Sequence, residues 1–89
     1  MRRVKILVAG RVQGVYFRYF THNKAKELGI LGRVRNLEDG RVEIIAEAEP
    51  GALDAFIHWC HKGPVTARVD NVEISELDRS ETFATFTRH

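Results

Sequence analysis

The chain of 89 residues lacks the features that mark an exported or membrane-bound protein. Its one cysteine, Cys60, excludes an internal disulfide. No apolar run approaches the roughly 20 residues that a membrane helix requires, and the apolar stretch at residues 4–9 is too short for the hydrophobic region of a signal peptide. We therefore predict a cytoplasmic protein without a membrane partner.

A concentrated block of positive charge is also missing. The formal net charge is +2, and the arginines and lysines are spread thinly along the sequence. Nucleic-acid binders usually carry a basic run or patch, so we predict no nucleic-acid partner. With 44% hydrophobic residues, a chain of this length can bury one two-layer core. We expect a single domain over residues 1–89 that acts as a monomer.

The histidines do not have the spacing of a metal site. His58 and His61 are three residues apart on an expected helix, but no carboxylate or cysteine pattern completes a site around them. His22 and His89 lie far from them in the sequence. We predict neither a metal ion nor a cofactor. Cys60 lies on the apolar stripe of the same helix, so we expect it in the core rather than as a reactive thiol.

Hydrophobic periodicity and turn residues predict seven elements. The pair Asp39-Gly40 between two strand-like stretches indicates a hairpin, and Gly63-Pro64 ends a helix that Pro50 begins. Strands are expected at residues 4–9, 32–37, 41–48 and 69–77, helices at residues 20–28 and 50–62, and a short edge strand within residues 82–87.

This order is typical of an α+β, ferredoxin-like two-layer sandwich, in which an antiparallel sheet carries two helices on one face. We expect the short C-terminal strand at an edge of that sheet. The third strand inserts between the first two and runs opposite to both. The first and second strands then finish at the same end of the sheet. Arg18 and Asn36, although 18 positions apart in the sequence, can therefore meet in one site.

The loop after the first strand is suited to an anion. Residues 10–18 are GRVQGVYFR, and Gly10 and Gly14 allow tight turns and a close approach of the backbone to a ligand. Amides at the start of the next helix point outward, with the positive end of the helix dipole behind them. Arg18 adds a planar guanidinium that can hold two phosphate oxygens. The spacing excludes a Walker loop, because three residues separate the glycines and Val15 follows, and the dinucleotide fingerprint fails as well.

If this loop binds the phosphoryl group of a substrate, that substrate has to be intrinsically reactive. Asn36 offers a carboxamide that can hold a water molecule against phosphorus, but a carboxamide is not a strong base. The sequence places no histidine, aspartate or cysteine beside the loop to become phosphorylated, although His22 is nearby. A carboxyl–phosphate mixed anhydride, which has a carboxylate leaving group, meets this demand better than a phosphate monoester.

Two stretches resemble the signatures of the acylphosphatase family. Residues 10–18 resemble the first signature, and residues 32–36 (GRVRN), followed by Gly40 and Val42, are similar to the second. The resemblance covers the whole chain. It implies a small stand-alone enzyme that hydrolyses acyl phosphates to a carboxylate and inorganic phosphate without a metal ion or cofactor.

The resemblance also implies a role for each site residue. Arg18 takes the family's phosphate-binding role, and Asn36 orients the attacking water. The phosphate cradle consists of the main-chain amides of Gln13, Gly14, Val15, Tyr16, Phe17 and Arg18. The sequence departs from the family at Arg33, where an aromatic residue is usual, and at Ala48, where glycine is usual. Arg33 is expected to alter either the packing or the preference for the acyl portion, and its added charge would favour an acidic substrate.

Two other functions fit the same order of elements. An RNA-binding module should display aromatic residues on its third strand, and residues 41–48 contain none. A non-catalytic accessory module that binds a phosphate-bearing metabolite stays open as the alternative, because the same loop can bind phosphate without turnover. Such a module is expected within a larger synthase. The sequence has neither zinc-finger cysteines nor a second domain, so we expect the free enzyme.

Overall fold

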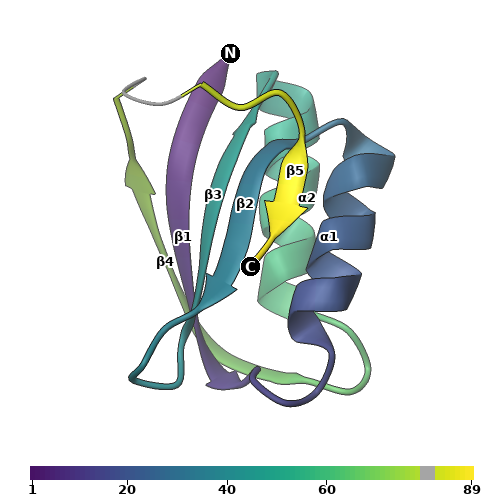
Figure 1. The fold of residues 1–89 in the computed structure, drawn as a ribbon, viewed down its shortest axis with the longest axis vertical. Coiled ribbons are helices and arrows are strands. Elements are labelled where there is room, and N and C mark those ends of the chain that lie inside the picture. Colours follow the sequence, from purple (N-terminus) through teal and green to yellow (C-terminus); the bar gives the residue numbers. More distant parts are fainter. Residues whose placement is uncertain (79–81) are drawn as a thin grey trace.

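The computed structural model describes residues 1–78 and 82–89, which form a sheet covered on one face by two helices (Figure 1). The strands are β1 (Arg2–Arg11), β2 (Leu31–Asn36), β3 (Val42–Ala48), β4 (Arg68–Glu76) and β5 (Phe86–Arg88), and the helices are α1 (Phe17–Leu28) and α2 (Pro50–Lys62). The predicted element order and the two-layer, ferredoxin-like architecture are confirmed. Neither of the described helices is long and apolar enough to cross a bilayer.

The strand order across the sheet is β4-β1-β3-β2-β5. As the sequence predicts, β3 lies between β1 and β2 and is antiparallel to both. Ile6 of β1, Ile44 of β3 and Val34 of β2 are neighbours in this register, and all three side chains are fully buried. The ends of β1 and β2 therefore lie at the same end of the sheet, where the loop of residues 12–16 begins (Figure 1).

The last strand differs from the prediction in its direction. β5 pairs with β2 in parallel, with Val34 opposite Arg88, so the sheet is antiparallel over β1 to β4 and mixed as a whole. β4 is antiparallel to β1 and ends beside Val4, where β1 begins. β5 begins at this same end of the sheet, with Phe86 opposite Gly32 near the start of β2. It therefore runs in the direction of β1 and β2.

The first helix starts earlier than expected, at Phe17 rather than residue 20. Tyr16 precedes it in the left-handed conformation, with φ 64°, so the chain enters the helix directly from the loop. Residues 16–20 include four aromatic side chains, which are weak helix formers and hid the start in the sequence. The ring of Phe17 is buried in the core beneath the sheet.

The core lies between the sheet and the helices. Val4, Ile6 and Val8 alternate along β1 and face the helices, where Phe56 of α2 is fully buried among them. Cys60 belongs to the same cluster, which confirms the predicted core position. Burial raises the pKa of its thiol, so the group stays neutral and acts as a small apolar side chain.

Gly32 allows β2 to approach both of its neighbours closely. Its φ is 140°, and a β-carbon at this position would lie 1.8 Å from the main-chain oxygen of Ile45 on β3. On the other side, the Gly32 amide donates to the Thr85 carbonyl at 3.1 Å, immediately before β5. Because Gly32 has no side chain, β2 can lie close both to β3 and to the residue that precedes β5.

We predict that Gly32→Ala lowers the free energy of unfolding by about 3 kcal/mol or more, because the new methyl group overlaps a main-chain oxygen. Gly40→Ala is the matched control. Gly40 also has a positive φ, 95°, but nothing lies within 4 Å of the point that a β-carbon would occupy there, so a loss of about 1 kcal/mol is expected. Urea denaturation measures both, and equal losses would contradict the steric explanation.

Candidate active site

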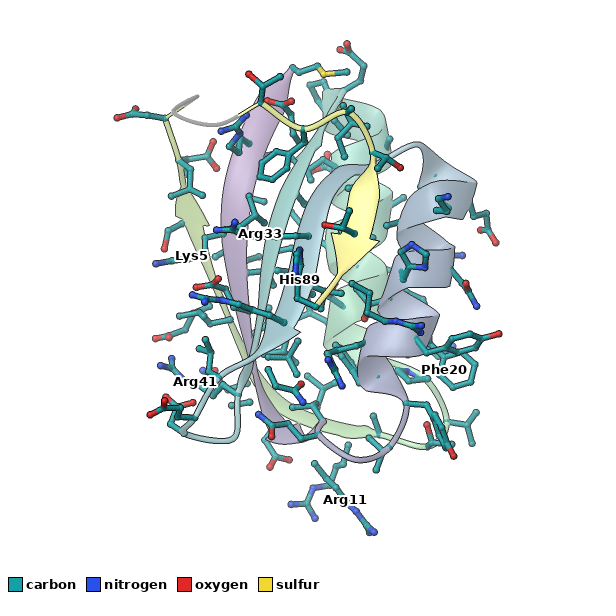
Figure 2. All side chains as sticks on the ribbon, in the orientation of Figure 1. Lys5, Arg11, Phe20, Arg33, Arg41 and His89 are labelled. Carbon is teal, nitrogen blue, oxygen red and sulfur yellow. The ribbon has the colours of Figure 1, made fainter. Side chains whose placement is uncertain are left out.

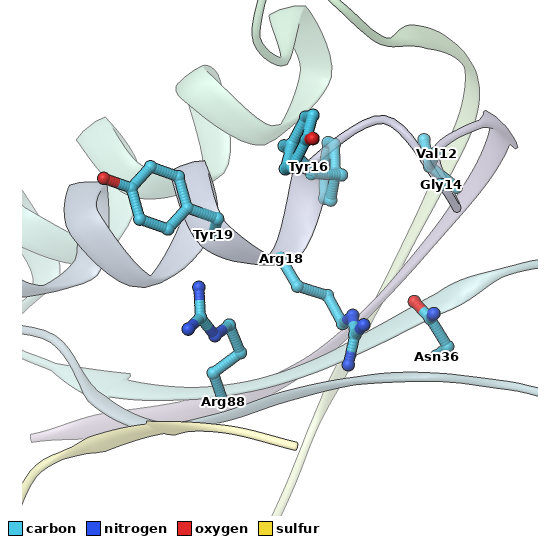
Figure 3. A pocket seen from close by; sticks show the side chains of 8 residues that line it. Val12, Gly14, Tyr16, Arg18, Tyr19, Asn36 and Arg88 are labelled. Atoms are coloured by element: carbon cyan, nitrogen blue, oxygen red, sulfur yellow. The ribbon is translucent and has the colours of Figure 1, made fainter.

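The loop after β1, the end of β2 and the end of β5 converge on one pocket of about 450 Å³ (Figure 3). This volume suits a small-molecule ligand. The pocket is lined by Val12, Gly14, Tyr16, Phe17, Arg18, Tyr19, Asn36 and Arg88. The structure therefore brings Arg18 and Asn36 together, as the order of strands predicts. Gly14, Tyr16 and Phe17 of the predicted cradle line the same pocket, whereas Gln13 and Val15 do not.

The N-terminus of α1 presents free amide donors to this pocket. The first amides of a helix have no partner within it, and the N-cap residue, Tyr16, makes no capping hydrogen bond with its side chain. The first turn contains no acidic residue. Gly14 and Tyr16 both have a positive φ, 73° and 64°, and these turns direct the loop into the helix. An anion at this position would meet amide hydrogens and the positive end of the helix dipole.

Tyr16 is the only residue other than glycine with a positive φ among residues 1–78 and 82–89. The left-handed conformation costs a residue with a β-carbon on the order of 1 kcal/mol. Residues held in this way are concentrated at ligand sites, where the surrounding structure maintains them. The strained turn at Tyr16 is therefore typical of a ligand-binding loop.

Gln13 and Val15 fasten the loop from outside the pocket. The side-chain amide nitrogen of Gln13, Nε2, donates to the main-chain oxygens of Leu37 and Arg41, at 2.8 and 3.0 Å. The carbonyl of Val15 accepts a hydrogen bond from the Thr66 hydroxyl at 2.7 Å. The first contact ties the loop to the hairpin that follows Asn36, and the second ties it to the segment before β4.

Arg18 and Asn36 point toward one another from opposite walls of the pocket (Figure 3). The Arg18 side chain is half-buried, and one of its terminal nitrogens donates to the carbonyl oxygen of His89. The amide of His89 in turn donates to the Val34 carbonyl at 2.9 Å, which holds the end of the chain against β2. Figure 2 shows His89 at this position beyond β5. His89 thus holds the Arg18 guanidinium in place at the pocket.

The sequence analysis missed three residues that line the pocket: Val12, Tyr19 and Arg88. Arg88 arrives only because β5 pairs with β2. Its carbon Cζ lies 5.4 Å from the centre of the Tyr19 ring, a cation–π contact between β5 and α1. The buried Phe86 was the one signal in this short strand, and it does not reveal the strand's partner.

His22 and Arg33, which the sequence also raised, do not line the pocket. The His22 ring packs against Phe86, with ring centres 6.1 Å apart. Arg33 alternates with the buried Val34, so it lies on the face of the sheet away from the helices (Figure 2). In the part of the chain that the structure describes, no three histidine, cysteine, aspartate or glutamate side chains form a group suited to a metal ion.

Comparison with known proteins agrees with this geometry. A family model described as Acylphosphatase matches residues 4–88. The chain belongs to the acylphosphatase family. An acylphosphatase of Marinobacter nauticus is 54% identical over 86 residues, which are 97% of this chain and 94% of the relative. Membership of the family makes the chain an enzyme, as the two signatures predict.

Solved structures of the acylphosphatase family have the same fold. The crystal structure of an acylphosphatase from Bacillus subtilis superposes with a TM-score of 0.94 and 37% identity, covering 100% of this chain and 99% of that one. The structure of T. kodakarensis HypF matches with a TM-score of 0.87 and 34% identity. That match covers all of this chain but only 12% of HypF, so a similar fold also occurs as a small part of a larger protein.

We predict that Gln13→Met lowers the free energy of unfolding by about 1 to 2 kcal/mol, because two carbonyl oxygens lose their donor. The loop should also bind inorganic phosphate more weakly, which is measured as a smaller stabilisation by phosphate in urea denaturation. Gln13→Glu has the same size but sets a carboxylate against both carbonyl oxygens, so its loss should be at least as large. Two variants as stable as the parent protein would show that this contact does not hold the loop.

Proposed function

We propose that this chain hydrolyses acyl phosphates to a carboxylate and inorganic phosphate, with water as the nucleophile and without a metal ion or cofactor. The proposal rests on one observation above all: Arg18 and Asn36 share a pocket with the uncapped N-terminus of α1. Membership of the acylphosphatase family supports the same conclusion.

The phosphoryl group binds between the loop and Arg18. The main-chain amides from Gln13 to Arg18 donate to its oxygens, and the Arg18 guanidinium holds two of them. These donors are fixed by the left-handed turn at Tyr16 and by the hydrogen bonds of Gln13, so they do not have to reorganise when charge shifts during transfer. Binding and stabilisation of the transition state thus come from the same groups.

The Asn36 carboxamide positions the water. Its oxygen accepts a hydrogen bond from the water, whose own oxygen then faces phosphorus. A phosphorus–oxygen bond forms to this water as the bond from phosphorus to the acyl oxygen breaks, and the electron pair of the broken bond leaves with the carboxylate. Both protons of the water end on the phosphate product, as its hydroxyl groups. No side chain needs to become phosphorylated.

The leaving group explains why such a simple site suffices. A carboxylate is a stable anion, so the acyl–phosphate bond breaks without a general acid to protonate it. A phosphate monoester would release an alkoxide, and its uncatalysed hydrolysis is among the slowest known. The described pocket contains no histidine, aspartate or glutamate that could protonate such a group. Selectivity for mixed anhydrides follows from the chemistry of the site.

The test is the release of inorganic phosphate from benzoyl phosphate by purified protein in the presence of EDTA, with phenyl phosphate as the monoester control. We expect turnover of the acyl phosphate alone, unchanged by the chelator. Loss of activity in EDTA, restored by a divalent cation, would contradict the metal-free mechanism. Phosphate binding without any turnover would favour the accessory binding module instead.

We predict that Arg18→Ala and Asn36→Ala affect different steps. Arg18→Ala should abolish stabilisation by inorganic phosphate and lower kcat/KM by about 1000-fold, because the phosphoryl group loses its cation. Asn36→Ala should lower kcat by about 100-fold while the affinity for phosphate stays nearly unchanged, since only the water loses its acceptor.

Arg68→Ala and Asn71→Ala are matched controls on β4. Both side chains are exposed and lie outside the pocket, and Arg68 is paired with Asp70 at 3.0 Å. Both controls should keep near-normal kinetics. Near-normal turnover in either site variant would remove the role assigned to that residue.

The wider expectations belong to the same proposal. We propose that residues 1–89 act as one catalytic unit and as a monomer in the cytoplasm, without a nucleic-acid or membrane partner. The net charge of +2, without a basic block, supports a small anion rather than a polyanion as the ligand.

A further inference from the structure

The pocket contains a second guanidinium that the phosphoryl group does not require. Arg88 lines the same pocket as Arg18 and Asn36, although it comes from β5 at the far edge of the sheet. Its neighbour His89 is bonded both to Arg18 and to Val34. The backbone that carries Arg88 is therefore fixed next to the phosphate site.

Five arginines outside the pocket differ from Arg88 in having an acidic partner. Ion pairs with acidic side chains join Arg2 to Glu76, Arg3 to Glu47, Arg35 to Glu43, Arg41 to Asp39 and Arg68 to Asp70. Arg18 donates to the main-chain oxygen of His89, but within residues 1–78 and 82–89 no aspartate or glutamate forms an ion pair with Arg18 or Arg88. Two positive charges thus face one pocket, which suits a ligand with two anionic groups.

The positions of the two arginines assign different parts of the substrate to them. In Figure 3, Asn36 and Gly14 lie on one side of the Arg18 guanidinium, and Arg88 and Tyr19 lie on the other. In phosphoryl transfer the attacking and leaving oxygens are roughly in line through phosphorus. If Asn36 holds the water, the acyl group leaves away from Asn36, toward Arg88.

Tyr19 orients Arg88 without using its hydrogen-bond donors. The guanidinium carbon lies 5.4 Å from the ring centre, and Tyr19 is about half exposed, at 47%. A cation–π contact lies on one side of the guanidinium, so the N–H groups directed away from the ring stay available to a carboxylate. The ring thus limits the positions that the guanidinium can take.

We propose that Arg88 is a specificity-determining residue that binds a carboxylate in the acyl part of the substrate. This inference rests on the proposed function, and it names a substrate class within it: acyl phosphates derived from dicarboxylic acids. One carboxyl group of the acid is joined to phosphate and faces Arg18, and the other is free and pairs with Arg88. Tyr19 is a positioning residue that acts through Arg88.

The experiment compares 3- and 4-carboxybenzoyl phosphate with benzoyl phosphate. The ring keeps the free carboxylate away from the acyl carbon, so it cannot hydrolyse its own anhydride as a flexible chain would. The readout is the ratio of kcat/KM for each carboxylated substrate to that for benzoyl phosphate. The ratio cancels defects in phosphate binding or folding that affect all substrates alike.

For Arg88→Gln we expect the ratio of the better carboxylated isomer to fall about fivefold to tenfold, with kcat/KM for benzoyl phosphate changed by less than about threefold. Arg68→Gln removes the same charge outside the pocket and should leave the ratio unchanged, which separates a direct contact from a general loss of attraction. Tyr19→Leu should lower the ratio, and Tyr19→Phe should retain it.

Each of three results would overturn the proposal. They are an unchanged ratio in Arg88→Gln, an equal fall of the ratio in Arg68→Gln, and a loss of Arg88→Gln activity toward benzoyl phosphate as large as that toward the carboxylated substrates. The last result would place Arg88 on the phosphoryl group or in the framework. Failure of the proposed function is distinct, because the parent protein would then hydrolyse none of the three substrates.

Discussion

The position of β3 between β1 and β2 is the constraint on which the site depends. Because β3 is antiparallel to both neighbours, β1, which leads into the loop of residues 12–16, and β2, which ends at Asn36, finish at the same end of the sheet. The buried register of Ile6, Ile44 and Val34 makes a slip costly, since a shift by one residue would turn apolar side chains out of the core. Hydrophobic packing in the middle of the sheet thus sets a distance between polar groups at its end.

Local contacts then refine what the register brings together. Gln13 joins the loop to both sides of the β2–β3 hairpin, and Thr66 holds it from the side of β4. The loop is fixed from two directions, and the strained turn at Tyr16 persists because these contacts outweigh its cost. The amides at the start of α1 belong to the main chain, so conspicuous side chains alone do not reveal them.

Much of this arrangement could be predicted from the sequence because its signals are local. The glycines and Arg18 of residues 10–18, the Asp39-Gly40 turn and the apolar stripe around Cys60 each lie within one short segment. The strand order follows from the succession of elements. The approach of Arg18 to Asn36 then follows from topology alone.

The remaining features depend on pairings that no local pattern encodes. The parallel contact of β5 with β2 occupies three residues, too few for a periodic signal, and Arg88 enters the pocket only through it. The sequence instead directed attention to Arg33 as the unusual charge, although alternation along β2 places that residue on the opposite face from the core. The start of α1 was missed for a local reason, because the aromatic side chains of residues 16–20 are weak helix formers.

The hydrogen bond from Arg18 to His89 has a consequence for the timing of folding. Its two residues are 71 positions apart, so the bond closes a loop that spans most of the chain. Contacts of such long sequence separation form late, because the entropy of closing the loop is lost before the contact contributes. The hairpins and helices can form before that loop closes. Arg18 therefore reaches its final geometry only when β5 docks. In the proposed mechanism, activity would thus serve as a sensitive marker of complete folding.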